Sequence, residues 1–76
     1  MYWELKKMRT INNLTQEDMA NILKISLSSY NLKENGERDF TMEEIKIVLE
    51  TLGCKYEDIF SSKTVKKKHD EIKSML

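Results

Sequence analysis

The sequence predicts a compact all-α domain of five short helices. The 76 residues include no proline and only two glycines. Apolar residues recur at helical spacing, whereas the alternation typical of β-strands is absent. Serine or threonine precedes three of the apolar patterns, as expected at helix starts. A domain of this length has a small core and marginal stability.

Capping residues predict where the helices begin. Thr15 is followed three residues later by Asp18, and Thr41 is followed at the same spacing by Glu44, which are capping-box arrangements. Ser26 is suited to cap the helix between them. The predicted helices cover residues of about 2–12, 16–23, 27–34, 42–52 and 56–61.

Two glycines predict helix ends. Gly36 follows the third predicted helix and Gly53 follows the fourth, where a left-handed residue commonly ends a helix. The inward faces of the helices give the expected core. It comprises Leu5, Met8, Met19, Ala20, Leu23, Ile25, Tyr30, Ile45, Val48, Leu49, Leu52, Ile59 and Phe60.

Composition limits the classes of function. The chain has 13 basic and 13 acidic side chains, but residues 1–60 carry eight basic and eleven acidic ones, giving −3. Charge alone therefore argues against nucleic-acid binding. No nucleophile–base pair, phosphate-binding loop or supported carboxylate dyad occurs, so we expect no catalysis. We also expect no small-molecule cofactor.

Cysteine content and hydropathy predict the compartment. Cys54 is the only cysteine, so no intrachain disulfide forms and a reducing cytoplasm fits best. The thiol is expected to be buried and inert. His69 has no neighbouring metal ligands in the sequence, so no metal site is expected. No apolar run approaches the roughly 20 residues of a membrane span, so no membrane partner is expected.

The second and third predicted helices are separated only by residues 24–26. Two helices of about eight residues joined by so short a turn cross at a steep angle. The second of them is then prominent on the surface and has a size that fits a DNA major groove about 12 Å wide. This arrangement predicts a helix-turn-helix.

Residues 14–36 resemble the phage repressor/Cro family, also called the XRE-type helix-turn-helix. The resemblance rests on Gln16 opening a helix, on Ala20 at the helix crossing and on the sequence 34–36, Glu-Asn-Gly. It extends over about residues 4–60. It implies a lambda-repressor-like fold that binds double-stranded DNA. The implied function is sequence-specific transcription regulation, as a prophage or mobile-element repressor that dimerises on a palindromic operator.

The resemblance assigns roles to twelve residues. It implies base contacts from Leu27, Ser28, Asn31 and Leu32, phosphate contacts from Gln16, Ser29, Asn35 and Arg38, and structural roles for Arg9, Ala20, Glu34 and Gly36. Alternatives remain open for some of these. The two leucines are alternatively part of the core, Gln16 is alternatively an ordinary solvated residue, and Arg38 alternatively pairs with an adjacent acid.

Three positions depart from the family pattern. Lys24 stands in the turn where glycine is usual, and a left-handed lysine costs about 1 kcal/mol. Lys33 replaces an apolar residue, and we expect its stem to cover the core while its ammonium reaches solvent. Glu37 and Asp39 flank Arg38, which weakens the expected phosphate contacts.

The chain divides into a domain over residues 1–61 and a basic tail over 62–76. Three roles stay open for the tail: dimerisation, contact with phosphates, or disorder. The remaining apolar surface is expected around the fifth helix and the tail, and would form a weak homodimer. Its residues are Tyr56, Phe60, Val65, Ile72 and Leu76. The alternative function is an antitoxin-like or partner-binding protein-interaction module with weak or no specific DNA binding.

Overall fold

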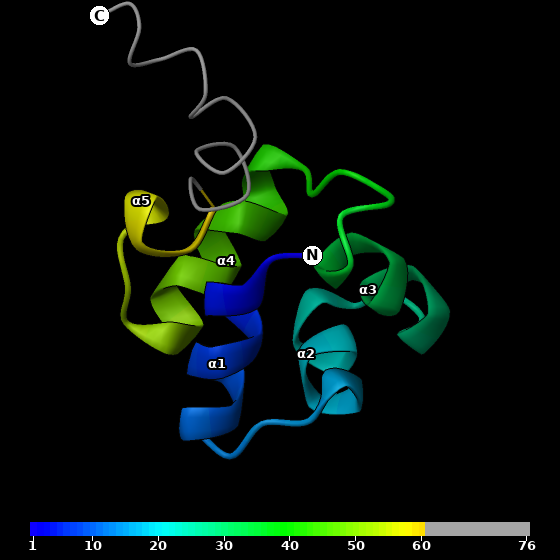
Figure 1. Cartoon of the computed structure of the whole chain (residues 1–76). Coiled ribbons are helices and arrows are strands. Elements are labelled where there is room, and N and C mark those ends of the chain that lie inside the picture. The colour runs from blue at the N-terminus through cyan, green and yellow to red at the C-terminus, as the bar shows by residue number, and fades with distance from the viewer. Residues whose placement is uncertain (61–76) are drawn as a thin grey trace, which may run out of the picture.

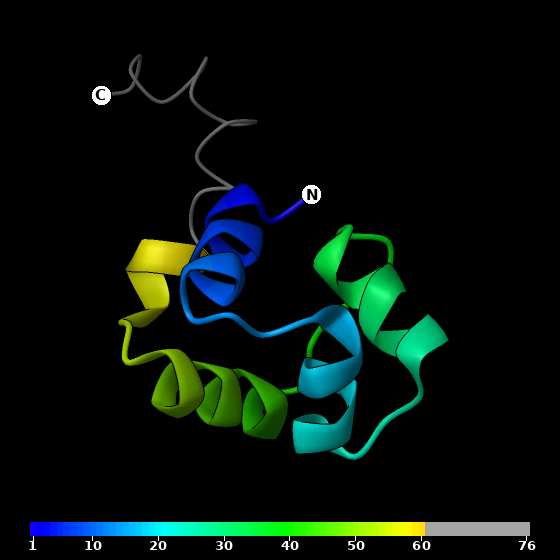
Figure 2. The same cartoon turned by 90° about the horizontal axis from the view of Figure 1, so that it is seen from below.

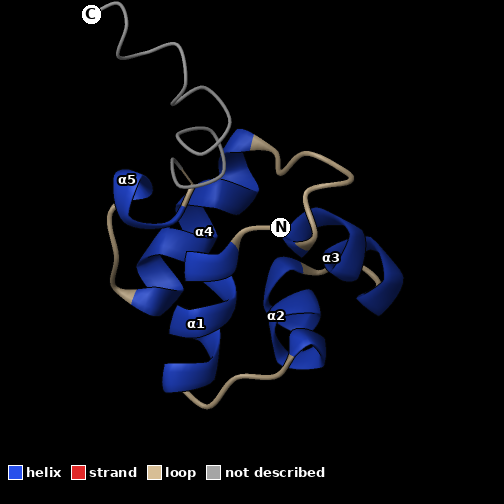
Figure 3. Ribbon diagram, in the orientation of Figure 1, coloured by secondary structure: helices blue, strands red, loops and turns tan. Residues whose placement is uncertain are grey.

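A computed structural model of the chain describes residues 1–60. The described part contains helices and no strand, which confirms the all-α prediction (Figure 3). The fifth helix ends at Ile59, somewhat earlier than predicted, and the other helices begin and end within one residue of the predicted positions. The helices are α1 (Trp3–Ile11), α2 (Gln16–Leu23), α3 (Leu27–Glu34), α4 (Met42–Leu52) and α5 (Tyr56–Ile59).

α3 lies at one side of the domain and α5 lies at the opposite side (Figures 1 and 2). α2 packs mainly against α3 and also contacts α4, while α1 contacts α5. Ala20 is almost fully buried, and its carbonyl accepts a hydrogen bond of 2.9 Å from the Ile25 amide in the turn. The small side chain permits the close approach of the chain at this point.

Side-chain caps fix the starts of three helices, as predicted. The Thr15 hydroxyl accepts from the Asp18 amide at 3.0 Å, and the Asp18 carboxylate accepts from the Thr15 amide at 2.8 Å. Thr41 and Glu44 repeat this capping box at 3.0 and 2.9 Å. The Ser26 hydroxyl accepts from the amide three residues later at 3.0 Å. These contacts satisfy amides that a helix start leaves without partners.

Left-handed residues end two of the helices. Lys24 follows α2 with φ 60° and ψ 43°, so the turn adopts the backbone that glycine usually supplies. Gly53 follows α4 with φ 69°. A Cβ added at Gly53 would meet no atom within 4 Å, so the backbone angle and not lack of space favours glycine there.

The core differs from the predicted one in two respects. Phe40 lies in the loop between α3 and α4, outside any helical periodicity, yet it is buried. Its ring centroid lies 6.0 Å from that of Tyr2, 6.2 Å from Tyr30 and 5.3 Å from Phe60. Four of the predicted core residues are only partly buried: Met8, Ile25, Ile45 and Leu49. The loop residue Phe40 therefore adds aromatic packing to the core that helical periodicity does not predict.

Phe60 does not belong to an exposed dimer surface, and that part of the prediction is wrong. It is 3% exposed, with its ring edge-on to Tyr2 at 5.3 Å. Tyr56 stacks on it and remains half exposed. The remaining proposed dimer residues, Val65, Ile72 and Leu76, lie outside the described residues.

The expectation that unassigned apolar surface lies only near α5 and the tail is also wrong. Trp3 and Ile11 on α1 are 58% and 61% exposed, and they border a surface hollow of about 430 Å³. None of the helices described is both long enough and apolar enough to cross a membrane.

Candidate nucleic-acid interface

The four residues expected to contact bases lie together at the surface of α3. Leu27 and Ser28 are exposed at its start, and Asn31 and Leu32 are half-buried one turn later. With Gln16 from the start of α2, they line a single hollow of about 430 Å³. The fold therefore brings the expected base-reading residues next to the expected phosphate contact.

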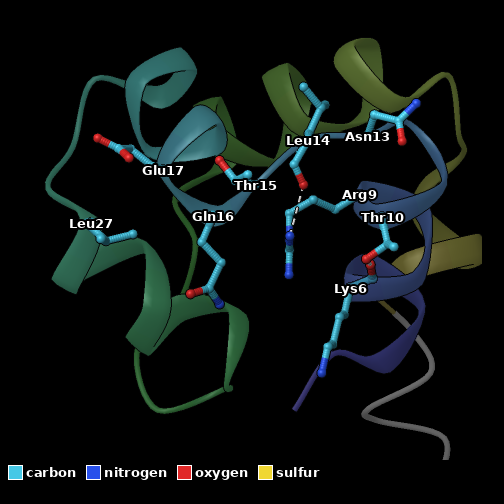
Figure 4. Close-up of a pocket in the computed structure, with 9 residues that line it drawn as sticks. All are labelled: Lys6, Arg9, Thr10, Asn13, Leu14, Thr15, Gln16, Glu17 and Leu27. Atoms are coloured by element: carbon cyan, nitrogen blue, oxygen red, sulfur yellow. Dashed lines mark hydrogen bonds between the residues drawn. The ribbon is translucent and has the colours of Figure 1, made fainter.

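A second hollow, of about 730 Å³, opens between α1, α2 and the start of α3. Gln16 and Arg9 extend into it from α2 and α1, Lys6 lies at its α1 side, and Leu27 approaches it from α3 (Figure 4). Lys6 was not among the expected contacts. Lys6 and Gln16 line the same hollow, so the surface on which phosphate contact is expected includes a further cation.

Glu34 accepts four hydrogen bonds, although its side chain is fully buried. Arg9 donates through Nε at 2.8 Å and through Nη2 at 3.3 Å. The Tyr30 hydroxyl donates at 2.9 Å, and the Gln16 amide donates through Nε2 at 2.7 Å. Arg9 also donates to the Leu14 carbonyl at 2.9 Å (Figure 4). One carboxylate thus ties α1, α2 and α3 together.

The protonation of the groups around Glu34 is set by their surroundings. Burial, together with the nearby carboxylate, raises the pKa of Tyr30, so its hydroxyl stays protonated and donates. The hydrogen bond to Glu34 raises the pKa of Arg9 and outweighs the opposing effect of burial. Each of these groups therefore donates a hydrogen bond to the Glu34 carboxylate, whose oxygens can only accept hydrogen bonds when ionised.

The Gln16 side chain connects this carboxylate to two further amides. Asn31 Nδ2 donates to Gln16 Oε1 at 3.2 Å, and Asn35 Nδ2 donates to Asn31 Oδ1 at 3.2 Å. The amide ladder, defined as Gln16, Asn31 and Asn35, runs from the start of α2 to the C-cap of α3. Gln16 is therefore held by protein contacts and is not simply a solvated side chain.

Arg38 is on the exposed loop that follows α3, and it lies next to Ser29 of that helix. Its Nη1 donates to Ser29 Oγ at 3.2 Å. Within residues 1–60 the ion pairs are Arg9–Glu34 and Lys33–Glu44, so neither neighbouring acid pairs with Arg38. Gly36, which precedes this loop, has φ 85°. Two expected phosphate contacts are thus adjacent, and no carboxylate within residues 1–60 forms an ion pair with the Arg38 guanidinium.

A family model described as a helix-turn-helix domain matches residues 4–65. The chain belongs to the helix-turn-helix domain family. A comparison with curated proteins finds no match. Membership indicates a DNA-binding domain of a kind that is typically not an enzyme, and α2 and α3 supply the two helices that name the family.

Lys33 shows that one sequence expectation for this helix-turn-helix domain was wrong. Its ammonium does not reach solvent: the residue is 7% exposed, and Nζ lies 2.6 Å from Glu44 Oε1. The same oxygen caps α4 by accepting from the Thr41 amide. Nζ also lies 6.0 Å from the centre of the Phe40 ring. The end of α3 meets the start of α4, so the capping carboxylate comes within reach of the lysine.

The Lys33 contact also affects Glu44. Burial alone would raise the pKa of this carboxyl, but the hydrogen bonds from Lys33 and from the Thr41 amide outweigh it, so the pKa is lowered. Sequence reasoning found Glu44 as a cap but not as an ion-pair partner, because the residues are eleven positions apart on different helices.

Sequence reasoning also missed the amide ladder and the Tyr30 contact. Tyr30 and Glu34 are four residues apart in α3, and Asn31 and Asn35 have the same spacing. That spacing places side chains on the same helical face, so it was an available signal. The link from Asn31 to Gln16 joins different helices, and no local spacing predicts it.

Within the part of the chain that the structure describes, Cys54 and the acidic residues do not gather into a metal site. The thiol is half-buried, burial raises its pKa, and its Sγ lies 3.5 Å from the Leu52 carbonyl oxygen. A protonated thiol is a weak nucleophile and a poor metal ligand. Within residues 1–60, no three His, Cys, Asp or Glu side chains gather where they would hold a metal ion.

Proposed function

We propose that the protein is a transcription regulator that binds specific double-stranded DNA sequences by placing α3 in the major groove. The observation that carries this proposal is the shared surface of Leu27, Ser28, Asn31 and Leu32 next to Gln16. A protein that reads a groove needs base-contacting and phosphate-contacting groups on the same face. The proposed base contacts lie on α3, and the proposed phosphate contact Gln16 lies at the start of α2.

The proposed roles follow from the chemistry of the side chains. Ser28 and Asn31 hydrogen-bond to base edges, while Leu27 and Leu32 contact thymine methyl groups. The phosphate contacts are assigned to Gln16, Ser29, Asn35 and Arg38. Arg38 is the strongest of these, because a guanidinium matches phosphate in charge and geometry.

The charge of the domain predicts that DNA binding depends only modestly on salt concentration. Residues 1–60 carry a net charge of −3, and two of their eight basic side chains, Arg9 and Lys33, are buried in ion pairs. Few phosphates are therefore neutralised by one domain. The logarithm of the DNA-binding constant changes with the logarithm of the salt concentration by about −0.9 per phosphate contact. We therefore expect a small slope for each protomer.

We further propose that the chain acts as a prophage or mobile-element repressor and binds a palindromic operator as a homodimer. A single domain of this size covers one half-site, which gives too little discrimination among competing genomic sites. Two half-sites about one helical turn apart solve this for two-fold dimers. Sedimentation of the full chain with and without the selected palindrome tests this: one duplex should bind two chains, and a one-to-one complex would contradict it.

The experiment that tests DNA binding is selection from a random duplex library with the full chain. Ser28→Ala should relax the preference at particular base pairs by roughly 1–3 kcal/mol. Arg38→Ala should weaken all sequences alike and reduce the salt slope by about one contact. Asn21→Ala serves as a matched control, because this residue is exposed on α2 and outside the proposed interface.

Selection that enriches no duplex at low salt would refute the proposal. The protein-interaction module would then take its place, since the exposed Trp3 and Ile11 on α1 favour contact with another protein. Equal effects of the two substitutions on every sequence would instead show that α3 does not read bases.

A further inference from the structure

The outward side of α1 carries large apolar side chains that the core does not use. Trp3 and Ile11 are both more than half exposed, and neither belongs to the core or to the partly buried residues that pack on it. They are the first and last residues of the nine-residue helix, so about 12 Å of helix axis separates them. Exposed apolar residues grouped in this way commonly mark a binding surface.

A hollow of about 430 Å³ connects the two ends of this surface. The outer face of α1 is defined here as the residues that line it: Trp3, Lys6, Lys7, Thr10 and Ile11. The Lys6 ammonium lies 5.8 Å from the centre of the Trp3 ring, so a positive charge stands directly at the apolar surface. The outer face is therefore apolar at its ends and has two lysines between them.

No carboxylate balances these two lysines. Within residues 1–60 the ion pairs involve neither Lys6 nor Lys7, and Glu4, the acidic residue of α1, does not line the hollow. Residues 1–60 carry a net charge of −3, so the outer face is opposite in sign to the domain around it. A ligand that complements this face presents apolar groups together with negative charge.

Charge also decides between the possible occupants. Residues 61–76 of the same chain contain five lysines and two acids, so their charge has the same sign as the outer face. A two-fold contact between copies would bring the same lysines of both chains together. An anionic membrane would meet the whole domain, whose net charge is also negative. A short acidic segment of a different protein meets only the outer face, and it is the occupant that the charges favour.

We propose that the outer face of α1 binds an acidic, amphipathic segment of another protein. Apolar side chains of that segment contact Trp3 and Ile11, and its carboxylates lie against the lysines. The inference does not depend on DNA binding, because none of the residues that line this hollow lines the one at the start of α3. Lys6 also lines the larger hollow that Gln16 lines, so the partner lies next to the proposed phosphate contacts and leaves the proposed base contacts free.

The test is selection from a library of random peptides with the full chain, followed by calorimetric titration of a synthetic copy of an enriched peptide. We expect enriched peptides to combine aspartate or glutamate with apolar residues at helical spacing. Trp3→Ala should weaken binding of the peptide by at least about tenfold. Lys7→Gln should weaken it roughly two- to fivefold, and this difference should shrink as salt is added.

Two substitutions on α4 are matched controls. Met42 and Lys46 are both exposed there, so Met42→Ala removes an exposed apolar side chain and Lys46→Gln removes an exposed cation at another place in the fold. Each should change the affinity for the peptide by less than about twofold. Circular dichroism of every variant verifies that the helices remain.

A library that yields no enriched peptide, or only peptides without acidic residues, would overturn the inference. Equal binding by Trp3→Ala would also overturn it, since the lysines of residues 61–76 would then account for the attraction. Self-association of the full chain that Trp3→Ala abolishes would assign the face to a second copy instead. Binding to anionic vesicles that Trp3→Ala abolishes would assign it to a membrane.

The outcome is separable from that of the DNA-binding proposal. Trp3→Ala should leave the affinity for the selected duplex unchanged, and Ser28→Ala should leave the affinity for the peptide unchanged. Peptide binding is expected even if no duplex is selected. If Trp3→Ala weakens duplex and peptide alike, one surface serves both ligands and the inference of a separate protein-binding face fails.

Discussion

Lys33 and Glu34 are neighbours at the end of α3, and each forms a buried ion pair on a different side of the helix. Glu34 faces α1 and α2, where it has no exposed surface and four hydrogen bonds. Lys33 faces α4, where its Nζ contacts one oxygen of a carboxylate that already caps that helix. The first pair is linked through Gln16 to the proposed DNA surface. The second pair joins the end of α3 to the start of α4.

This difference shows that buried charge has two separate uses in the domain. The Arg9–Glu34 pair has several additional partners, so removing either member leaves buried polar groups without contacts. In the Lys33–Glu44 pair the carboxylate side chain is 12% exposed, against 0% for Glu34, and Glu44 keeps its backbone partner when the lysine is absent. We therefore expect the first pair to be indispensable for folding and the second to be replaceable.

The largest effect should come from Glu34→Gln. This change keeps the shape of the side chain but leaves the Arg9 charge buried without a counter-ion, which costs about 3–5 kcal/mol. Urea denaturation followed by circular dichroism measures the loss. A loss below about 1 kcal/mol would show that the carboxylate charge is not required and would remove the distinction between the two pairs.

Lys33→Met should have a smaller effect, on the order of 1–2 kcal/mol, because it leaves Glu44 partly buried without its cation. Adding Glu44→Gln should restore stability, since glutamine retains the capping oxygen and carries no charge. The double variant is the control for the single one in the same denaturation experiment. A double variant less stable than Lys33→Met alone would contradict the view that this pair is replaceable.

Tyr30→Phe should cost about 1 kcal/mol, the value of one hydrogen bond, because Glu34 keeps its three contacts from Arg9 and Gln16. The ring itself continues to pack near Phe40. Thermal unfolding provides the measurement. A loss comparable to that of Glu34→Gln would mean that the hydroxyl, and not the arginine, is the principal partner of the carboxylate.

The smallest effect concerns pH. The pKa of Glu44 is lowered from its ordinary value of 4.5, so its contribution to stability is complete above about pH 4.5 and disappears as the pH falls through the folded-state pKa. The stability difference between the unmodified chain and Glu44→Gln should therefore narrow on acidification below that pH. Denaturant titrations at several pH values would test it, and a constant difference would show that Lys33 does not stabilise the charged form.

Local features were the most predictable. Thr15, Ser26 and Thr41 begin helices because a hydroxyl next to free amides is a local arrangement that the sequence displays directly. Gly53 and Lys24 end helices with the expected left-handed backbone. The crossing of α2 and α3 followed from the length of the turn between them. Each of these predictions depends on residues that lie within a few positions of one another.

Features that depend on distances between helices were harder to predict. The burial of Lys33 depends on where α4 begins relative to the end of α3, and Phe40 is buried because three rings from separate segments meet it. At the candidate site, the positions of Ser28 and Leu27 follow from the start of α3. The hydrogen bonds from Gln16 to Glu34 and from Asn31 to Gln16 depend on how α2 meets α3, so no pattern along α3 alone reveals them.

The position of the single tryptophan determines what intrinsic fluorescence can report about this protein. Trp3 is 58% exposed on α1, and the Lys6 ammonium lies 5.8 Å from the centre of its ring. We therefore expect its emission in the native state to be close to that of a solvated indole, and unfolding of the core to change it less than it would change a buried tryptophan. Tyr30, which is fully buried, is the chromophore that senses the interior. A blue shift of the indole band on mixing with another molecule thus marks coverage of the outer face of α1.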